Sequence, residues 1–175
     1  MALQINGVSY SLSHLSKFER KIDVPLKGGF TKKILVEFRF SPHCYSRGLS
    51  EGEVMPAGMK VADGARDRVF DLRRYNLSFN LVASIDALIA AQGDVHKSRH
   101  DNFFRIDNLE ETLDGVVTPI SYYIFMSAEK ESEPNKEKRI RIYVESAYPL
   151  LANVPAPHSK RVLPFVEVLG KIWAP

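Results

Sequence analysis

The feature that most constrains the fold is a pair of strand-like runs in the second half of the chain, at 120–128 and 139–147. Both are rich in β-branched and aromatic residues, which are enriched in strands. Between them lies a charged segment, 129–138, that contains Pro134-Asn135. Because proline and asparagine favour turns, this pattern predicts an antiparallel hairpin with an exposed tip at 129–138.

The clearest helical pattern lies at about 76–92, and Gly93 follows it as a stop signal. The apolar residues that recur there at helical spacing are Leu77, Leu81, Ile85, Leu88 and Ile89. Elsewhere we expect a short strand or hairpin arm at 5–10 with a turn at Asn6-Gly7, a short helix at 11–20, and strands at 32–40, 68–72 and 102–107. Segment 162–173 fits either a terminal helix or a last strand.

This order of elements predicts an α+β fold, a single domain over 1–175. It has a mostly antiparallel β-sheet, one long central helix and short terminal helices. Between the early strands, segment 48–65 carries four glycines and a proline with few apolar anchors. We expect a mobile loop there, because long loops in compact domains are usually functional or disordered.

Composition narrows the class of protein. The chain has 175 residues, 45% hydrophobic and 26% charged, which is ordinary for one soluble globular domain. No apolar run approaches the ~20 residues that span a bilayer, and the N-terminus lacks a secretory signal pattern. The single cysteine, Cys44, excludes an internal disulfide, so we expect a cytoplasmic protein without membrane contact. A net charge of +3 permits a polyanionic partner without requiring one.

A candidate site follows the predicted strand at 32–40. After Ser41-Pro42 come five reactive or polar side chains in succession: His43, Cys44, Tyr45, Ser46 and Arg47. Loops held by a rigid strand often carry functional groups. His43 suits general acid–base chemistry because its pKa ordinarily lies near working pH.

Cys44 has two interpretations. A thiol-dependent enzyme would need a base other than His43, because adjacent residues at a strand end point to opposite sides. The candidates are His14, His96, His100 and His158. A free cysteine is also among the most commonly buried residue types, so a structural role is favoured.

The strand at 139–147 is a second candidate. Alternation places Ile140, Ile142 and Val144 on one face and Arg139, Arg141, Tyr143 and Glu145 on the other. Two guanidiniums and a phenol on an open sheet face suit phosphate contact and base stacking. The alternative is the solvated face of a half-buried sheet, which shows the same alternation.

A dense basic cluster precedes the predicted helix. It contains Arg66, Arg68, Arg73 and Arg74, interleaved with Asp67 and Asp71. Neighbouring ion pairs and anion binding explain it equally well. Arginines near a helix start oppose the helix dipole, which favours a role other than helix stability. His96 and His100 have a helical metal spacing, but no recognised zinc pattern or cofactor fingerprint accompanies them, so we expect no metal and no cofactor.

Segments 122–125 and 139–148 resemble small ribonuclease toxins of the barnase/EndoU/RelE-like superfamily, including nuclease domains of phages and mobile elements. Members often end a late strand with a sequence similar to Ser146-Ala147-Tyr148 and place a histidine or arginine at an earlier strand end, as His43 and Arg47 are here. The resemblance implies metal-independent RNA cleavage and a cytoplasmic role in toxin–antitoxin or phage–host conflict. It also implies an antitoxin or other protein partner.

In this reading the RNA 2′-hydroxyl attacks the adjacent phosphorus. His43 is the acid or base, Arg47 and Arg141 hold the phosphate, and Ser146 or Tyr148 positions it. Tyr45 or Tyr143 stacks on a base, and Arg68 and Arg74 contribute to substrate binding. The alternative is a non-catalytic phage or mobile-element protein that binds and inhibits a host protein. Catalysis predicts that His43, Arg47 and the strand end at 141–148 converge on one cleft, whereas a binder predicts a broad surface with exposed aromatic residues.

Overall fold

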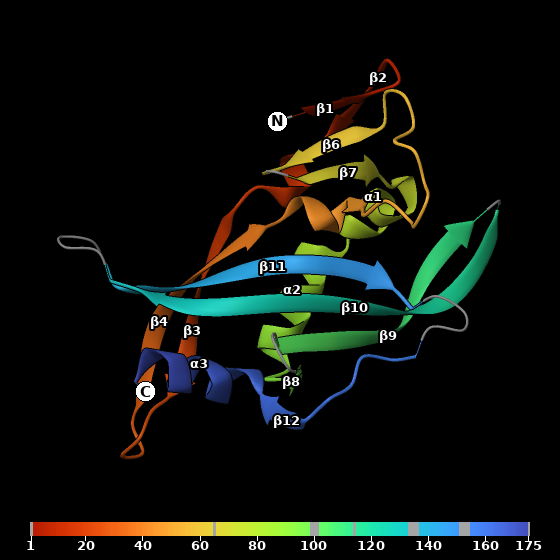
Figure 1. The fold of residues 1–175 in the computed structure, drawn as a ribbon. Helices are drawn as coiled ribbons and strands as arrows, with labels where there is room; N and C mark the ends of the chain where they lie inside the picture. The colour runs from red at the N-terminus through yellow and green to blue at the C-terminus, as the bar shows by residue number, and fades with distance from the viewer. Residues whose placement is uncertain are drawn as a thin grey trace.

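The computed structural model describes residues 2–64, 66–98, 102–113, 115–132, 137–150 and 155–174. The fold is α+β, and its largest element is a seven-stranded sheet (Figure 1). Neighbouring strands are antiparallel except β11 and β4, which are parallel. From edge to edge the strands are β12 (Arg161–Pro164), β8 (Asp94–Lys97), β9 (Asn102–Leu113), β10 (Val116–Glu131), β11 (Arg139–Pro149), β4 (Thr31–Phe40) and β3 (Phe18–Pro25).

Strands β10 and β11 confirm the predicted antiparallel pairing, from Tyr122↔Pro149 to Glu131↔Arg139. The strands are longer than expected, so only part of the predicted tip at 129–138 lies between them, and 133–136 fall outside the described residues. The register shifts at Phe125/Met126, which makes Glu145 an extra residue of β11. This bulge changes which residues point inward, from Val144 before it to Ala147 after it.

The predicted helix at 11–20 is wrong. A short 3-10 turn, η1 (Ser13–Leu15), is followed by strand β3. In β3, Ile22 and Val24 are buried while Lys21 and Asp23 are exposed, a period of two that pairs the strand with β4. Upstream, β1 (Ala2–Ile5) and β2 (Val8–Ser11) form the expected hairpin, with Asn6 and Gly7 at positive φ.

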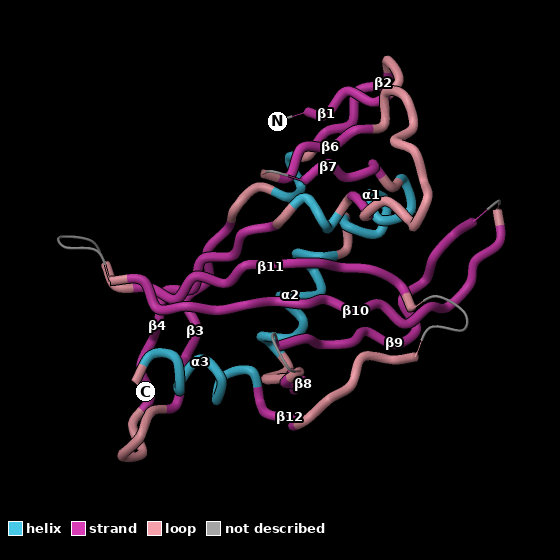
Figure 2. The backbone as a smooth tube through the Cα atoms, viewed as in Figure 1, coloured by secondary structure: helices cyan, strands magenta, loops and turns pink. Residues whose placement is uncertain are grey.

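The single long central helix is also wrong, because the segment divides into α1 (Leu72–Ser78) and α2 (Leu81–Ala90) (Figure 2). At the break the Ser78 hydroxyl donates to the Tyr75 carbonyl at 2.6 Å, and the Asn80 side-chain Nδ2 donates to the Leu77 carbonyl at 3.2 Å. Such local bonds compete with helix continuation. Downstream, segment 162–173 is both a strand and a helix, since β12 runs directly into α3 (Phe165–Trp173).

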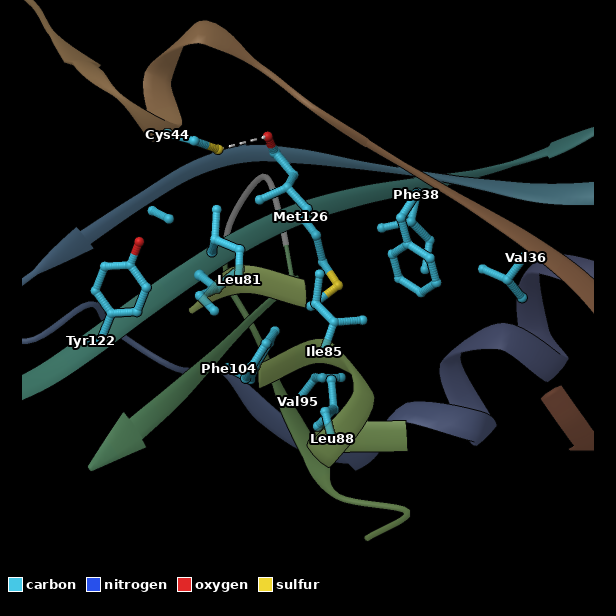
Figure 3. Packing of buried hydrophobic residues seen from close by; sticks show 14 of the residues in the cluster. Val36, Phe38, Cys44, Leu81, Ile85, Leu88, Val95, Phe104, Tyr122 and Met126 are labelled. Carbon is cyan, nitrogen blue, oxygen red and sulfur yellow. Dashed lines mark hydrogen bonds between the residues drawn. The ribbon is translucent and has the colours of Figure 1, made fainter. Parts of the chain in front are cut away.

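A smaller sheet, in the order β5 (Ser46–Arg47), β7 (Arg66–Phe70) and β6 (Lys60–Asp63), lies beside α1. Part of the predicted loop at 48–65 is therefore strand β6, and the predicted strand at 68–72 is β7 followed by the start of α1. The core lies between the large sheet and α2 (Figure 3). Leu81, Ile85 and Leu88 of α2 pack there with buried side chains from the strands, including Phe104, Tyr122 and Met126.

Candidate active site

The segment after β4 is a 3-10 turn, η2 (Pro42–Cys44), fastened to β11. The Ser41 hydroxyl accepts a hydrogen bond from the His43 amide at 3.0 Å and donates to the Glu145 carbonyl at 2.6 Å. The Ser41 amide donates to the Val144 carbonyl at 3.0 Å. This anchoring turns Cys44 into the core and leaves the His43 side chain 35% exposed.

His43 forms a close pair with a carboxylate that the sequence did not single out. Its Nε2–H donates to Asp63 Oδ2 at 2.7 Å, which fixes the ring and its tautomer. Asp63 ends β6, inside the predicted loop. The signal that could have found it is Asp63-Gly64, an Asp-Gly pair of the kind that marks hairpin turns, set between Val61 and Val69.

The small sheet brings Arg68 to the same place. In its register Asp63 pairs with Arg66, Val61 with Arg68 and Ser46 with Phe70. Alternation therefore puts Asp63, Arg68 and Ser46 on one face of the sheet. The Arg68 guanidinium donates from Nε to Ser46 Oγ at 2.9 Å and from Nη2 to the Ser46 carbonyl at 3.2 Å.

Arg74 reaches this group from α1. Asp71 caps the helix by accepting a hydrogen bond from the Arg74 amide at 3.0 Å, and so holds Arg74 in the first turn. The Arg74 guanidinium donates to the Ser46 carbonyl at 3.1 Å and to the His43 carbonyl at 3.3 Å. It also lies 5.1 Å from the centre of the Tyr148 ring. We call His43, Ser46, Asp63, Arg68 and Arg74 the η2 corner.

Two guanidiniums of the η2 corner are partly desolvated. Burial lowers the pKa of Arg68, and the nearby Asp63 carboxylate only partly opposes this. Burial also lowers the pKa of Arg74, against the charge of Asp71. Both remain cationic, because the ordinary pKa of arginine lies far above neutral pH. Partly desolvated cations interact strongly with an incoming anion.

Arg74 also lines a cleft of about 130 Å³. We call it the arginine cleft, and it is lined by Arg47, Asp71, Arg73, Arg74, Tyr148 and Pro149. Arg47 donates two hydrogen bonds to Glu53, both at 2.6 Å, and Arg73 donates two to Glu111, both at 2.7 Å. The guanidinium groups of Arg47 and Arg73, which could each bind a phosphate, are thus already paired with carboxylates.

Five of the residues predicted to act in catalysis or substrate binding lie at the η2 corner or the arginine cleft. They are His43, Arg47, Arg68, Arg74 and Tyr148. Two others do not reach this place. Arg141 lies in an ion-pair network with Glu37, Glu129 and Glu131, and Tyr143 lines a separate hollow next to it.

Three residues of the candidate segments have other surroundings. Cys44 is fully buried, its thiol donates to the Val144 carbonyl at 3.7 Å, and burial raises its pKa to about 12. Tyr45 belongs to the core, and burial raises its pKa as well. Ser146 lies next to the bulge in β11, opposite Phe125.

The described part of the chain contains no group of three or more His, Cys, Asp or Glu residues that could hold a metal ion. His100, which has a helical spacing from His96 in the sequence, falls outside the described residues. Of the described helices, none has both the length and the apolar character needed to cross a membrane.

Comparison with known proteins gives one match. No curated protein and no solved structure is similar to the chain. The model of the YjaZ family, however, matches residues 2–173. The matched range includes both the η2 corner and the arginine cleft. The chain therefore belongs to the YjaZ family.

Proposed function

We propose that this protein is a metal-independent endoribonuclease, with the η2 corner as its reaction site. One observation carries the proposal: His43 is held by Asp63 at 2.7 Å next to Arg68. Among the described residues, no carboxylate lies within 4.0 Å of the Arg68 guanidinium. An oriented imidazole next to a cation that has no directly bonded carboxylate among the described residues suits proton removal close to a phosphate.

His43 takes the role of general base. Asp63 accepts the Nε2–H, so the lone pair of Nδ1 is free to receive the proton of the RNA 2′-hydroxyl. The 2′-oxygen then attacks the adjacent phosphorus, and the bond to the 5′-oxygen breaks as that oxygen takes a proton from water, which gives a 2′,3′-cyclic phosphate and a 5′-hydroxyl. As His43 becomes charged, Asp63 stabilises the imidazolium, as in other His–carboxylate pairs.

Arg68 and Arg74 stabilise the negative charge that develops on the phosphoryl oxygens. Both are held by the Ser46 carbonyl, so their positions are set before the substrate arrives. Tyr148 stays protonated because burial raises its pKa, and it can donate a hydrogen bond to the same phosphate. Arg141 and Tyr143 have no role in this mechanism. Arg141 belongs to the separate ion-pair network of Glu37, and Tyr143 lies beside that network.

The test is cleavage of a fluorescently labelled RNA oligonucleotide in the presence of EDTA. We expect the wild type to yield fragments ending in a 2′,3′-cyclic phosphate and to leave the matching DNA intact. His43→Ala should lower the rate by about 10²–10⁴-fold, the usual contribution of a general base. Asp63→Asn should lower it by up to about 10⁴-fold, as for the carboxylate of other catalytic His–carboxylate pairs, because an amide favours the wrong tautomer of the histidine.

Lys60→Gln is the matched control, since Lys60 is exposed, lies on the same strand as Asp63 and pairs only with Asp67 among the described residues. It should cleave at the wild-type rate. If the wild type leaves RNA intact, or if His43→Ala cleaves as well as the wild type, the endoribonuclease proposal is wrong. Arrest of bacterial growth with RNA fragmentation on induced expression would link the activity to a toxin role.

A second candidate is a non-catalytic protein that binds and inhibits a host protein. The observation that favours it is the arginine cleft, where Glu53 and Glu111 already neutralise Arg47 and Arg73. In that case RNA stays intact with the wild type. A tagged protein should then retain a host partner that Arg73→Glu fails to retain.

A further inference from the structure

A second cationic surface lies at the other end of the molecule from α1, β6 and β7. Figure 1 shows the C-terminal end of α3 next to the hairpin that joins β3 to β4. Lys130 of β10 reaches the same place, since its ammonium donates to the Trp173 carbonyl at 2.5 Å. We call Lys27, Phe30, Lys32, Lys130 and Trp173 the lysine–tryptophan patch.

Two lysine ammonium groups of this patch lie close to the same aromatic ring, that of Trp173. The ammonium of Lys32 lies 5.0 Å from the centre of the Trp173 ring, and that of Lys130 lies 4.9 Å from it. Cation–π attraction favours each contact, but it does not neutralise either charge. Lys130 also caps the end of α3, which accounts for its own position but not for that of Lys32.

In the described part of the chain, no carboxylate lies within 4.0 Å of the ammonium of Lys27, Lys32 or Lys130. Two flanking lysines are neutralised, Lys33 by Asp23 at 3.0 Å and Lys171 by Glu167 at 2.6 Å. The salt bridges among the described residues include none to Lys27, Lys32 or Lys130. Three exposed cations that no carboxylate among the described residues pairs with, two of them against one ring, favour an anionic ligand with several charges.

An exposed aromatic ring sits among these charges. Phe30 is 61% exposed and follows Gly28-Gly29, both at positive φ. A Cβ on Gly28 would lie 2.9 Å from the Phe30 ring, so this turn needs glycine to let the ring lie over it. The hairpin thus presents one aromatic ring to solvent next to lysines that form no ion pair with the described residues.

We infer that the lysine–tryptophan patch binds single-stranded nucleic acid, with the lysines on phosphates and Phe30 stacked on a base. Positive charge along the backbone combined with stacking on aromatic rings is how single strands are bound without sequence preference. A lipid surface fits less well, because interfacial binding scales with buried apolar area and Phe30 is the one large exposed apolar side chain of the patch. That the natural ligand is RNA rests on the proposed function.

The experiment measures fluorescence anisotropy of a labelled oligo(dT) at increasing salt. DNA lacks the 2′-hydroxyl, so binding is read without cleavage. We expect Lys32→Gln/Lys130→Gln to reduce the slope of log K against log salt by about 1.4, since each phosphate contact on a single strand contributes about 0.7. Phe30→Ser should weaken binding at least about fivefold, and Phe30→Trp should restore it.

Lys21→Gln/Lys60→Gln is the control, because it removes the same charge from exposed positions outside the patch. It should leave the slope as in the wild type, and circular dichroism should show that every variant is folded. An unchanged slope in Lys32→Gln/Lys130→Gln would overturn the inference. So would patch-dependent binding to phosphatidylserine vesicles without binding to oligo(dT).

The two proposals fail separately. If RNA cleavage depends on His43 but the patch variants bind oligo(dT) as the wild type does, the patch inference is wrong and the endoribonuclease proposal stands. If patch-dependent oligo(dT) binding occurs while RNA stays intact, the patch inference stands and the reaction site is wrong.

Discussion

Replacing Glu37 by glutamine tests whether the charged face of the large sheet contributes to stability. The Glu37 side chain is 2% exposed and accepts hydrogen bonds from four cationic groups. They are Arg39 at 2.7 Å, Lys17 at 3.4 Å, Arg139 at 3.4 Å and Arg141 at 3.5 Å. Glutamine keeps the shape of the side chain but removes its charge.

The expected loss of unfolding free energy is about 2–3 kcal/mol. The close Arg39 contact is worth about 1.5 kcal/mol as a hydrogen bond to a charged group. The three longer contacts resemble surface pairs at about 0.3–0.5 kcal/mol each. The sum stays below the ~3–5 kcal/mol for breaking an interior ion pair, because the freed cations can turn to water.

The effect should depend on pH in a defined direction. Burial alone raises the pKa of Glu37, but the hydrogen bonds from Arg39 and Lys17 outweigh it, so the net pKa is lowered. A carboxyl group with a lowered folded-state pKa stabilises the fold above its unfolded pKa of about 4.3 and loses this contribution as pH falls toward the folded value. The difference between wild type and Glu37→Gln should therefore be constant near pH 7 and shrink below about pH 4.3.

Urea unfolding of both proteins at pH 7 and at pH 3.5 measures this difference. Glu129→Gln is the matched control, since Glu129 lies 3.5 Å from Arg141 but is 70% exposed. It should cost less than about 0.5 kcal/mol. A Glu37→Gln cost as small as that of the control, or one that grows on acidification, would refute the reasoning.

Three further predictions follow from burial and close packing. Burial raises the pKa of Cys44 to about 12 from 9.0, so at pH 8 the native protein contains about 1,000-fold less Cys44 thiolate than a free thiol would. Iodoacetamide should therefore label Cys44 only after unfolding in urea. Rapid labelling of the native protein would favour the thiol-dependent enzyme. Gly170→Ala should destabilise the protein by about 1–3 kcal/mol in urea unfolding, because the new Cβ would lie 2.6 Å from the Pro25 carbonyl; a neutral result would show that α3 shifts freely on β3. Arg68→Met should abolish RNA cleavage without lowering the urea midpoint, and a large loss of stability would make Arg68 a structural residue.

Alternation and turn residues predicted most of the sheet. The strands at 32–40, 102–107, 120–128 and 139–147 all exist, because each pairs along its length with neighbours that bury the same face. The prediction of a helix at 11–20 was wrong because the helical spacing of Leu12, Leu15 and Phe18 arose by chance. Pairing of β3 with β4 satisfies more backbone groups than an isolated short helix would.

The candidate site was predictable only in part. Residue chemistry pointed to His43 and Arg68, but not to Asp63, whose contact with His43 depends on the fold of β6 beside η2. Similarly, the sequence grouped Arg141 with Ser146 and Tyr148, the other predicted catalytic residues of β11. The bulge at Glu145 and the network around Glu37 separate it from them, and neither can be read from one strand.

Arg68 favours a functional interpretation of the η2 corner over a structural one. Its burial is unfavourable for a cation that lacks a close carboxylate in the described part of the chain. The two groups that accept hydrogen bonds from Arg68, the hydroxyl and the carbonyl of Ser46, have other partners. The hydroxyl donates to the Pro42 carbonyl at 2.7 Å, and the carbonyl accepts a hydrogen bond from Arg74 at 3.1 Å. An apolar side chain of similar length would therefore serve the fold as well or better. The fold therefore does not require a cation at this position. Arg68 Nε lies 2.9 Å from the hydroxyl of Ser46, which is between His43 and Gly48 in the sequence. An anion that binds at the η2 corner best explains the charge of Arg68.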